Sequence, residues 1–201
     1  MPENPTTFAS RGGLKLQAAL DAFGLDVRGW ICADFGANVG GFTDCLLHRG
    51  AAKVFAVDTG YGELAWKLRK DERVVVMERT NALYAELPQE AQAGGGVDLV
   101  VIDVAFTPQT LIVPAAQRWL KPMGHIISLI KPYYELSKQH PEGKAPARVE
   151  DAQAKRLCEH ICEELGEGML EVQGVIDSPL KGKGGNTEFL VHLRPRATAT
   201  P

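Results

Sequence analysis

A glycine-rich segment follows the first strongly apolar run of the chain. It reads Gly-Ala-Asn-Val-Gly-Gly over residues 36–41 and comes shortly after Asp34. A second apolar run, residues 54–57, ends at Asp58. The order strand, glycine turn, helix, strand and acid is typical of the start of a nucleotide-binding α/β sheet. Glycine lets the backbone approach a ligand where any Cβ would collide, and a carboxylate at Asp58 can accept hydrogen bonds from ribose hydroxyls.

The spacing of these glycines favours one class of nucleoside ligand. The pattern G-x-x-x-G-G differs from the G-x-G-x-x-G of dinucleotide enzymes. Asp34 would repel a pyrophosphate but could hold a cationic amine. S-adenosylmethionine has ribose hydroxyls, an amino group and a sulfonium, and it has no phosphate. The segment therefore predicts an S-adenosylmethionine site edged by Asp34 and Asp58; the alternative is a tight strand-to-helix turn with solvated acids.

Length and composition indicate one soluble globular domain. The chain has 201 residues, of which 45% are hydrophobic and 23% charged, and a formal net charge of −3. That charge makes no global case for nucleic acid, so any such case needs a local cationic patch. We expect a disordered N-terminus over residues 1–8, a domain over residues 9–194 and a disordered tail over residues 195–201. No membrane-length apolar run or secretory signal is visible, so we expect a cytoplasmic protein.

The four cysteines of the chain have no close-set pairing, which fits a reducing compartment. Cys158 and Cys162 are one helical turn apart and could in principle share a metal. They also share the apolar stripe of their helix with Leu157, Ile161 and Leu165, which favours core packing instead. We assign no metal site.

Hydrophobic periodicity predicts alternating strands and helices along the chain. Strands are expected over 30–33, 54–57, 74–77, 97–103, 125–130, 170–176 and 188–193. Helices are expected from Ser10 to Gly24, over 42–49, 62–70 and 149–165, and around 112–119, where Pro114 should lie near the first turn. Residues 133–148 should form an irregular loop that overhangs the ligand-binding edge. The fold class is therefore α/β, with the Rossmann-like fold of S-adenosylmethionine-dependent methyltransferases: a seven-stranded, mostly parallel sheet closed by an antiparallel C-terminal hairpin.

Four charged residues stand at the carboxyl ends of predicted strands. They are Asp34, Asp58, Asp103 and Lys131. In an open α/β sheet these ends share one edge, where ligands bind. The four side chains should therefore converge on one cleft, which favours an enzyme.

Several motifs, in order along the chain, resemble the FtsJ-type ribose methyltransferases. They are residues 10–16 (SRGGLKL), 34–42 (DFGANVGGF), 101–104 (VIDV), 129–132 (LIKP) and 186–190 (NTEFL). Residues 44–47 (DCLL) and 61–69 (YGELAWKLR) are similar to the narrower TlyA, or hemolysin A, group of rRNA 2′-O-methyltransferases. The resemblance covers about residues 9–194.

This resemblance implies roles for individual residues. The catalytic tetrad Lys-Asp-Lys-Glu of the family corresponds to Lys15, Asp103, Lys131 and Glu188. The cofactor-binding residues are expected to be Asp34, Gly36, Ala37, Asn38, Gly40, Gly41, Phe42, Asp58, Asn81 and Asp103.

Such a site must align a ribose 2′-hydroxyl with the sulfonium methyl group and remove its proton. Alignment can lower the barrier by about 7–11 kcal/mol at best, and a positioned base adds about 10²–10⁴-fold. Lys131 is the expected base. A neighbouring Lys15 ammonium favours its neutral form and Asp103 its charged form, and the sequence leaves open which prevails. The alternative is that the four residues form surface salt bridges.

An RNA substrate, most simply ribosomal RNA, needs cations and aromatic rings near the cleft. The expected RNA-binding residues are Arg11, Tyr133, Tyr134, Lys181 and Lys183, with Phe106 as a further stacking candidate. Each ring could instead serve packing, and the two lysines of the 181–186 turn could simply be solvated. Fuller TlyA-like proteins carry an S4-type RNA-binding domain before the methyltransferase, so a separate RNA-binding partner could replace it here.

Three other functions stay open at this stage. A small-molecule O-methyltransferase could use the same scaffold, although Lys15 and Glu188 would then have no obvious task. A non-catalytic RNA- or partner-binding module could keep the fold without binding the cofactor. A membrane-lytic protein has the least support, because the sequence has no spanning segment and no secretory signal.

Overall fold

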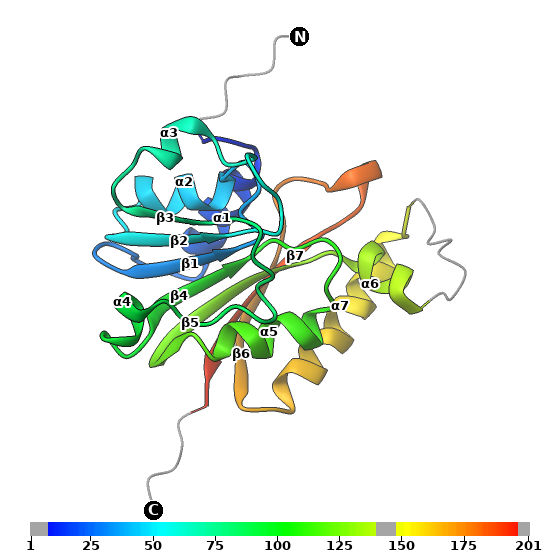
Figure 1. Cartoon of the computed structure of the whole chain (residues 1–201). Helices are drawn as coiled ribbons and strands as arrows, with labels where there is room; N and C mark the ends of the chain where they lie inside the picture. The colour runs from blue at the N-terminus through cyan, green and yellow to red at the C-terminus, as the bar shows by residue number, and fades with distance from the viewer. Residues whose placement is uncertain (1–7, 140–147, 197–201) are drawn as a thin grey trace, which may run out of the picture.

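The computed structural model describes residues 8–139 and 148–196, and it forms a three-layer αβα sandwich (Figure 1). The central sheet has seven strands in the order β3-β2-β1-β4-β5-β7-β6. The strands are β1 (Ile31–Phe35), β2 (Lys53–Val57), β3 (Val74–Met77), β4 (Val97–Ile102), β5 (Leu120–Ile130), β6 (Leu170–Asp177) and β7 (Phe189–Pro195).

Strands β1 to β5 pair in parallel, whereas β7 is antiparallel to both β5 and β6. The predicted fold class is therefore confirmed, including the C-terminal hairpin. The chain order reverses between β1 and β4, which are neighbours in the sheet. A ligand is expected in the crevice beyond the carboxyl ends of these two strands.

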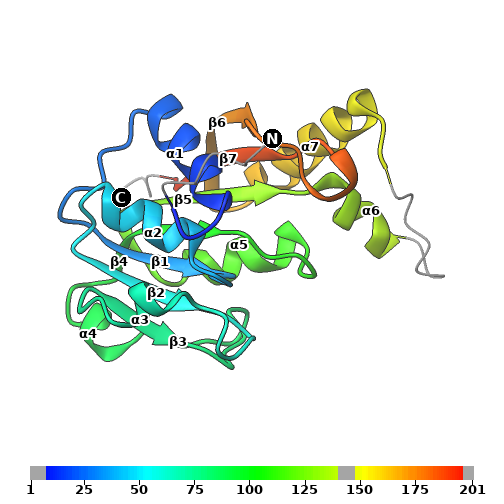
Figure 2. The same ribbon diagram turned by 90° about the horizontal axis from the view of Figure 1, so that it is seen from above.

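Helices cover both faces of the sheet (Figure 2). They are α1 (Gly12–Ala22), α2 (Gly41–His48), α3 (Trp66–Arg69), α4 (Gln89–Gln92), α5 (Gln109–Gln117), α6 (Pro132–Gln139) and α7 (Asp151–Gly166), with a short 3₁₀ turn, η1 (Lys183–Gly185), between β6 and β7. Residues of α1 and α2 pack with one face of the sheet in one core cluster, and residues of α5 and α7 pack with the other face in a second. The central strands are therefore buried on both faces, as their continuous apolar runs predict.

The cysteine pair of α7 belongs to the core, as the apolar stripe predicts. Cys158 is buried and Cys162 packs against the same cluster. Among residues 8–139 and 148–196, no group of three His, Cys, Asp or Glu side chains is arranged to hold a metal ion. In the same ranges, no helix is both long and apolar enough to span a bilayer.

Several predicted boundaries are wrong. The N-terminal prediction fails at Phe8, which is buried, and residues 1–7 lie outside the described ranges. Strand β7 continues to Pro195, into the predicted tail of residues 195–201, of which residues 197–201 are not described. Helix α3 occupies only the last part of the predicted 62–70 helix.

Two helices that contain proline differ from the prediction. Residues 132–139 form α6 where an irregular loop was expected, and residues 140–147 lie outside the described ranges. Pro132 occupies the first position of α6, where its fixed φ and missing N–H are tolerated. Helix α5 begins earlier than predicted, so Pro114 lies in its second turn rather than near its start.

Candidate active site

The loop after β1 passes unusually close to the end of β4. Gly36 has φ +89°, and a Cβ added there would lie 2.6 Å from the carbonyl oxygen of Asp103. Its amide donates to the carbonyl of Val57 at the end of β2. Only glycine satisfies both the positive φ and this close approach. The loop is therefore fixed between the carboxyl ends of β2 and β4, the two strands that flank β1.

Asp58 holds the same loop from the other side. Its carboxylate accepts hydrogen bonds from the amides of Asn38, at 2.8 Å, and Gly60, at 2.7 Å. Asn38 adopts φ +47°, a conformation that asparagine tolerates better than most residues. The acid predicted to bind ribose thus also shapes the glycine loop.

Asp34 lies beneath the loop and does not line the cavities described below. The side chain is fully buried, and its Oδ2 accepts from the amide (2.9 Å) and hydroxyl (2.6 Å) of Thr43 in α2. Its Oδ1 has no hydrogen-bond partner among the described residues. Burial raises the pKa of Asp34 to about 7, against the lowering effect of the Thr43 hydroxyl. Gly40 also lines neither cavity; it is the N-cap of α2, with φ +98°.

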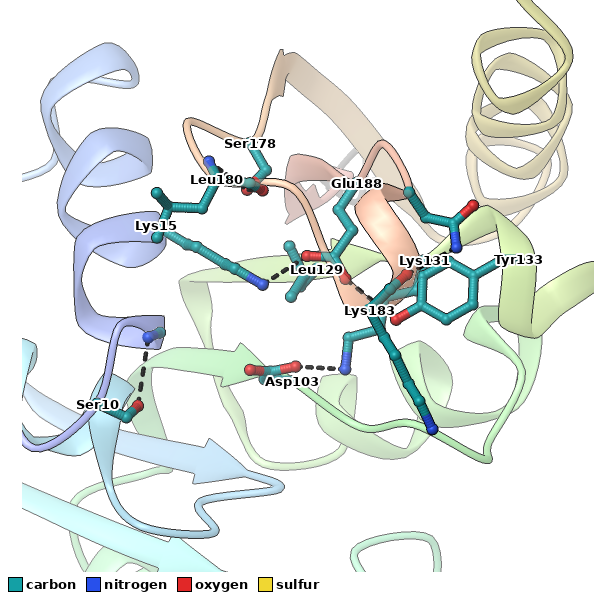
Figure 3. A network of polar contacts seen from close by, with 12 residues as sticks. Ser10, Lys15, Asp103, Leu129, Lys131, Tyr133, Ser178, Leu180, Lys183 and Glu188 are labelled. Atoms are coloured by element: carbon teal, nitrogen blue, oxygen red, sulfur yellow. Dashed lines mark hydrogen bonds and ion pairs between the residues drawn. The ribbon is translucent and has the colours of Figure 1, made fainter. Parts of the chain in front are cut away.

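The four tetrad residues meet on one wall of the site as two ion pairs (Figure 3). Lys15 Nζ lies 2.5 Å from Glu188 Oε2, and Lys131 Nζ lies 2.5 Å from Asp103 Oδ1. Lys131 also donates to the carbonyl of Val104 at 3.2 Å. The lysine side chains are 14% and 12% exposed, so these are not the solvated surface bridges of the alternative reading.

Two cavities adjoin at the glycine loop. The first has a volume of about 610 Å³ and is lined by the whole tetrad, by Ser10, Arg11 and Gly12, and by the loop between β6 and β7. The second, of about 410 Å³, is lined by residues that include Asp58, Thr80, Asn81 and Phe106. Gly36, Asn38 and Asp103 border both cavities. Volumes of this size are usual for small-molecule sites.

The predicted cofactor residues divide between these cavities. Ala37, Gly41 and Phe42 line the first, while Asp58 and Asn81 line the second. Sequence reasoning missed Thr80, although it follows β3 just as Asn81 does, and it missed the backbone around Val104 and Ala105.

The predicted RNA-binding residues have different surroundings. Arg11 and Lys183 are exposed and line the first cavity. Lys181 lines it too, but its amine donates to Thr187 at 2.6 Å and pairs with Asp151 at 3.3 Å. Lys181 is therefore tied to α7, although its side chain stays 53% exposed.

The aromatic candidates also differ from one another. Phe106 is 75% exposed, and its ring centroid lies 5.6 Å from that of half-buried Tyr134. Lys131 Nζ lies 5.7 Å from the Tyr134 ring. Tyr133, in contrast, is only 9% exposed and donates a hydrogen bond to Glu188 Oε1 at 3.3 Å, so its ring is not an open stacking platform.

A buried acid outside the predicted set secures the N-terminal wall of the first cavity. Asp44 in α2 is 3% exposed and accepts hydrogen bonds from the amide of Ala9 and from Lys67, both at 2.6 Å. This anchor holds the segment that leads into α1, which carries Lys15. Asp44 belongs to the sequence motif of residues 44–47 but has no predicted task in the site, because by position it is an ordinary first-turn acid of α2.

The second cavity fits a nucleoside that lacks phosphate. Its lining includes a strand-end carboxylate, Asp58, and the polar side chains of Thr59, Thr80 and Asn81; among the described residues, no lysine or arginine lines it that could neutralise a phosphate. Gly36 borders both cavities, and its lack of a Cβ lets the loop lie against the carbonyl of Asp103. These features suit the adenosine part of S-adenosylmethionine.

The chain was compared with known protein families, curated proteins and solved structures. The model of the family described as FtsJ-like methyltransferase matches residues 8–195. The 16S/23S rRNA (cytidine-2′-O)-methyltransferase TlyA of Mycobacterium tuberculosis is 43% identical over 194 residues, which cover 96% of this chain and 70% of TlyA.

A second curated relative and a solved structure are similar to this chain over most of its length. YqxC of Bacillus subtilis, named as a candidate rRNA methyltransferase, is 43% identical over 94% of this chain, and the chain spans 66% of the length of YqxC. A solved structure named as a candidate hemolysin of Streptococcus thermophilus is 38% identical with a TM-score of 0.85, covering 99% of this chain and 70% of that one.

Proposed function

The chain belongs to the FtsJ-like methyltransferase family, and from that premise we propose that it methylates a ribose 2′-hydroxyl of ribosomal RNA, with S-adenosylmethionine as the methyl donor. The observation that carries the proposal is the meeting of two partly buried ion pairs, Lys15–Glu188 and Lys131–Asp103, on one cavity wall beside the glycine loop. The named relatives that act on rRNA support the substrate class.

The two cavities divide the work. S-adenosylmethionine, when bound, supplies an activated methyl group. Asp58 would hold its ribose, Asn81 and Thr80 would face the base, and the backbone at Gly36 would admit the chain that joins the two cavities. The acceptor ribose would enter the first cavity, on the side of the tetrad.

Lys131 is placed to take the proton of the 2′-hydroxyl. A neutral amine has two N–H groups and one lone pair. Asp103 and the carbonyl of Val104 accept from Lys131, so they can hold both N–H groups and leave the lone pair for the hydroxyl proton. The Lys15 ammonium, held by Glu188, contributes positive charge where the oxygen gains negative charge.

RNA would approach over Arg11 and Lys183, whose exposed side chains border the first cavity. Such contacts to phosphate position the strand without reading its sequence. Phe106 and Tyr134 would offer aromatic faces to an unstacked base. An enzyme with this substrate would work in the cytoplasm, and a separate RNA-binding partner would strengthen its grip on the ribosome.

The test is transfer of a radiolabelled methyl group from S-adenosylmethionine to free rRNA, isolated ribosomal subunits and whole ribosomes. We expect label in an alkali-resistant linkage, as a 2′-O-methyl group produces. Lys131→Ala should reduce turnover by about 10²-fold or more while S-adenosylmethionine affinity stays within a few-fold. The matched control is Lys155→Ala, which removes an exposed lysine of α7.

Each result has a distinct meaning. Full turnover by Lys131→Ala would disprove its role as base. Methyl transfer to a metabolite but to no RNA would select a small-molecule O-methyltransferase. Transfer that needs an added ribosome-associated protein would support the separate RNA-binding partner.

A further inference from the structure

Tyr133 occupies an unexpected place beside the tetrad. It lies in the first turn of α6, directly after Pro132, and is only 9% exposed. Its hydroxyl donates to Glu188 Oε1 at 3.3 Å (Figure 3). The side chain therefore contacts the one tetrad acid that has no direct contact with Lys131 in the structure.

The Glu188 carboxylate is divided between two partners. Lys15 binds Oε2 at 2.5 Å, while Tyr133 binds Oε1. Glu188 is 2% exposed, so water has little access to either oxygen. A buried carboxylate oxygen without a hydrogen bond costs free energy. The Tyr133 hydroxyl removes that cost only while the Glu188 carboxylate keeps the orientation in which Oε1 faces Tyr133.

The Tyr133 hydroxyl acts as a donor and not as a base. Burial, followed by the negative charge of Glu188, raises the pKa of Tyr133 far above its usual value. The hydroxyl therefore keeps its proton at physiological pH and can donate it to the carboxylate.

The aromatic pair of α6 also links the two halves of the tetrad. The ring centroids of Tyr133 and Tyr134 lie 4.3 Å apart, and Lys131 Nζ lies 5.7 Å from the centroid of Tyr134. Contacts thus run from Lys15 through Glu188 and the two tyrosines to Lys131.

We propose that Tyr133 is a positioning residue: its hydroxyl locks the Glu188 carboxylate, and Glu188 in turn fixes the Lys15 ammonium at the acceptor cavity. This inference rests on the proposed methyl transfer for its kinetic test. It assigns Tyr133 a task inside the tetrad network in place of the base stacking expected from the sequence.

The first experiment compares Tyr133→Phe with the parent enzyme under saturating S-adenosylmethionine. We expect kcat to fall about tenfold, the size of one lost hydrogen bond to a charged group, while KM for RNA stays within twofold. Tyr84→Phe, which removes the hydroxyl of a tyrosine that is 80% exposed, is the matched control and should keep both constants. A rise in KM with unchanged kcat would overturn the proposal and indicate a direct RNA contact.

A double-mutant cycle tests whether Tyr133 acts through Glu188. In a Glu188→Gln background, Tyr133→Phe should add less than a twofold loss, because the carboxylate that it positions is gone. Multiplicative losses in the double variant would show that Tyr133 acts by another route and would overturn the proposal. Circular dichroism and the thermal midpoint identify any variant that fails to fold.

A third measurement needs no enzymatic activity. Lysine acylation by an N-hydroxysuccinimide ester, read by mass spectrometry, reports how firmly Lys15 is held. Tyr133→Phe should label Lys15 several-fold faster relative to exposed Lys155, because a freed Glu188 holds it less well. Unchanged labelling overturns the proposal. If the parent protein methylates no RNA, the proposed function fails, while the labelling result still decides the role of Tyr133.

Discussion

The carboxylate of Asp58 both holds the glycine loop and lines the second cavity. Its oxygens accept the amides of Asn38 and Gly60, and its side chain lines the cavity that suits adenosine. Each carboxylate oxygen has two acceptor sites, so Asp58 can fix the loop and still bind ribose hydroxyls. Binding of the cofactor and ordering of the loop should therefore depend on the same residue.

We expect Asp58→Ala to weaken S-adenosylmethionine binding by roughly 10- to 100-fold, since hydrogen bonds to a charged group are worth about 1.5–3 kcal/mol each. Isothermal titration calorimetry measures the change. Asp26→Ala is the control, because it removes an exposed acid paired with Arg28, away from both cavities. An Asp58→Ala protein that binds the cofactor like the parent would exclude the ribose-binding role.

At the scale of the elements, the β1–α2 loop depends on backbone conformation more than on side chains. Gly36 meets the carbonyl of Asp103, which places the glycine loop against the strand end that bears the tetrad acid. Any shift of this loop would therefore disturb the donor and acceptor cavities together.

Gly36→Ala should abolish measurable cofactor binding and lower stability by about 1–3 kcal/mol or more, through the positive φ and the close contact combined. Urea unfolding and calorimetry measure the two effects. Gly24→Ala isolates the first cause, because Gly24 also has a positive φ (+64°) but a Cβ there meets nothing within 4 Å. Equal losses in the two variants would mean that the contact with Asp103 is unimportant.

At the scale of the whole molecule, the free energy of unfolding contains two opposing proton linkages, one in strand β7 and one in strand β1. Burial, and then neighbouring His125 and Arg194, lower the pKa of His192 from 6.5 to about 4. Its ring nitrogen lies 2.9 Å from that of His125, and it packs against Phe23. Below pH 6.5 the unfolded chain binds this proton more readily, so the contribution of His192 falls as pH drops towards 4.

Asp34 changes the free energy of unfolding with pH in the opposite direction. Its pKa is raised from 3.8 to about 7 in the folded state, so the folded protein holds the proton between these values and loses stability as pH rises through them. The two effects should partly cancel in the parent protein between about pH 4 and 7.

Replacing His192 should leave the pH dependence that comes from Asp34 without its opposing contribution. Relative to the parent, His192→Gln should gain stability at pH 4.5 compared with pH 7.5, because the proton that favours unfolding is gone. Urea unfolding at several pH values measures this difference. His160→Gln, at an exposed position of α7, is the control and should show no such trend. A pH-independent difference for His192→Gln would contradict the linkage.

Much of the fold was determined by the sequence, because its signals are local. Strand β3 has the predicted bounds, and β2 and β4 differ by one residue, since continuous apolar runs can only be buried between two helical layers. The same reasoning placed Asp58, Asp103 and Lys131 at one edge, because parallel strands joined by crossover helices share the direction of their carboxyl ends. The glycine spacing fixed the turn that Gly36 makes.

Only the tertiary structure decided how side chains from distant elements meet. Lys15 and Glu188 are 173 positions apart, and their contact depends on how α1 and β7 pack around the sheet. Tyr133 became part of this network because Pro132 begins a helix there, and Asp34 was withdrawn beneath the loop by Thr43. A pattern of residue types specifies which surfaces are buried, whereas the choice among buried partners is made by packing geometry.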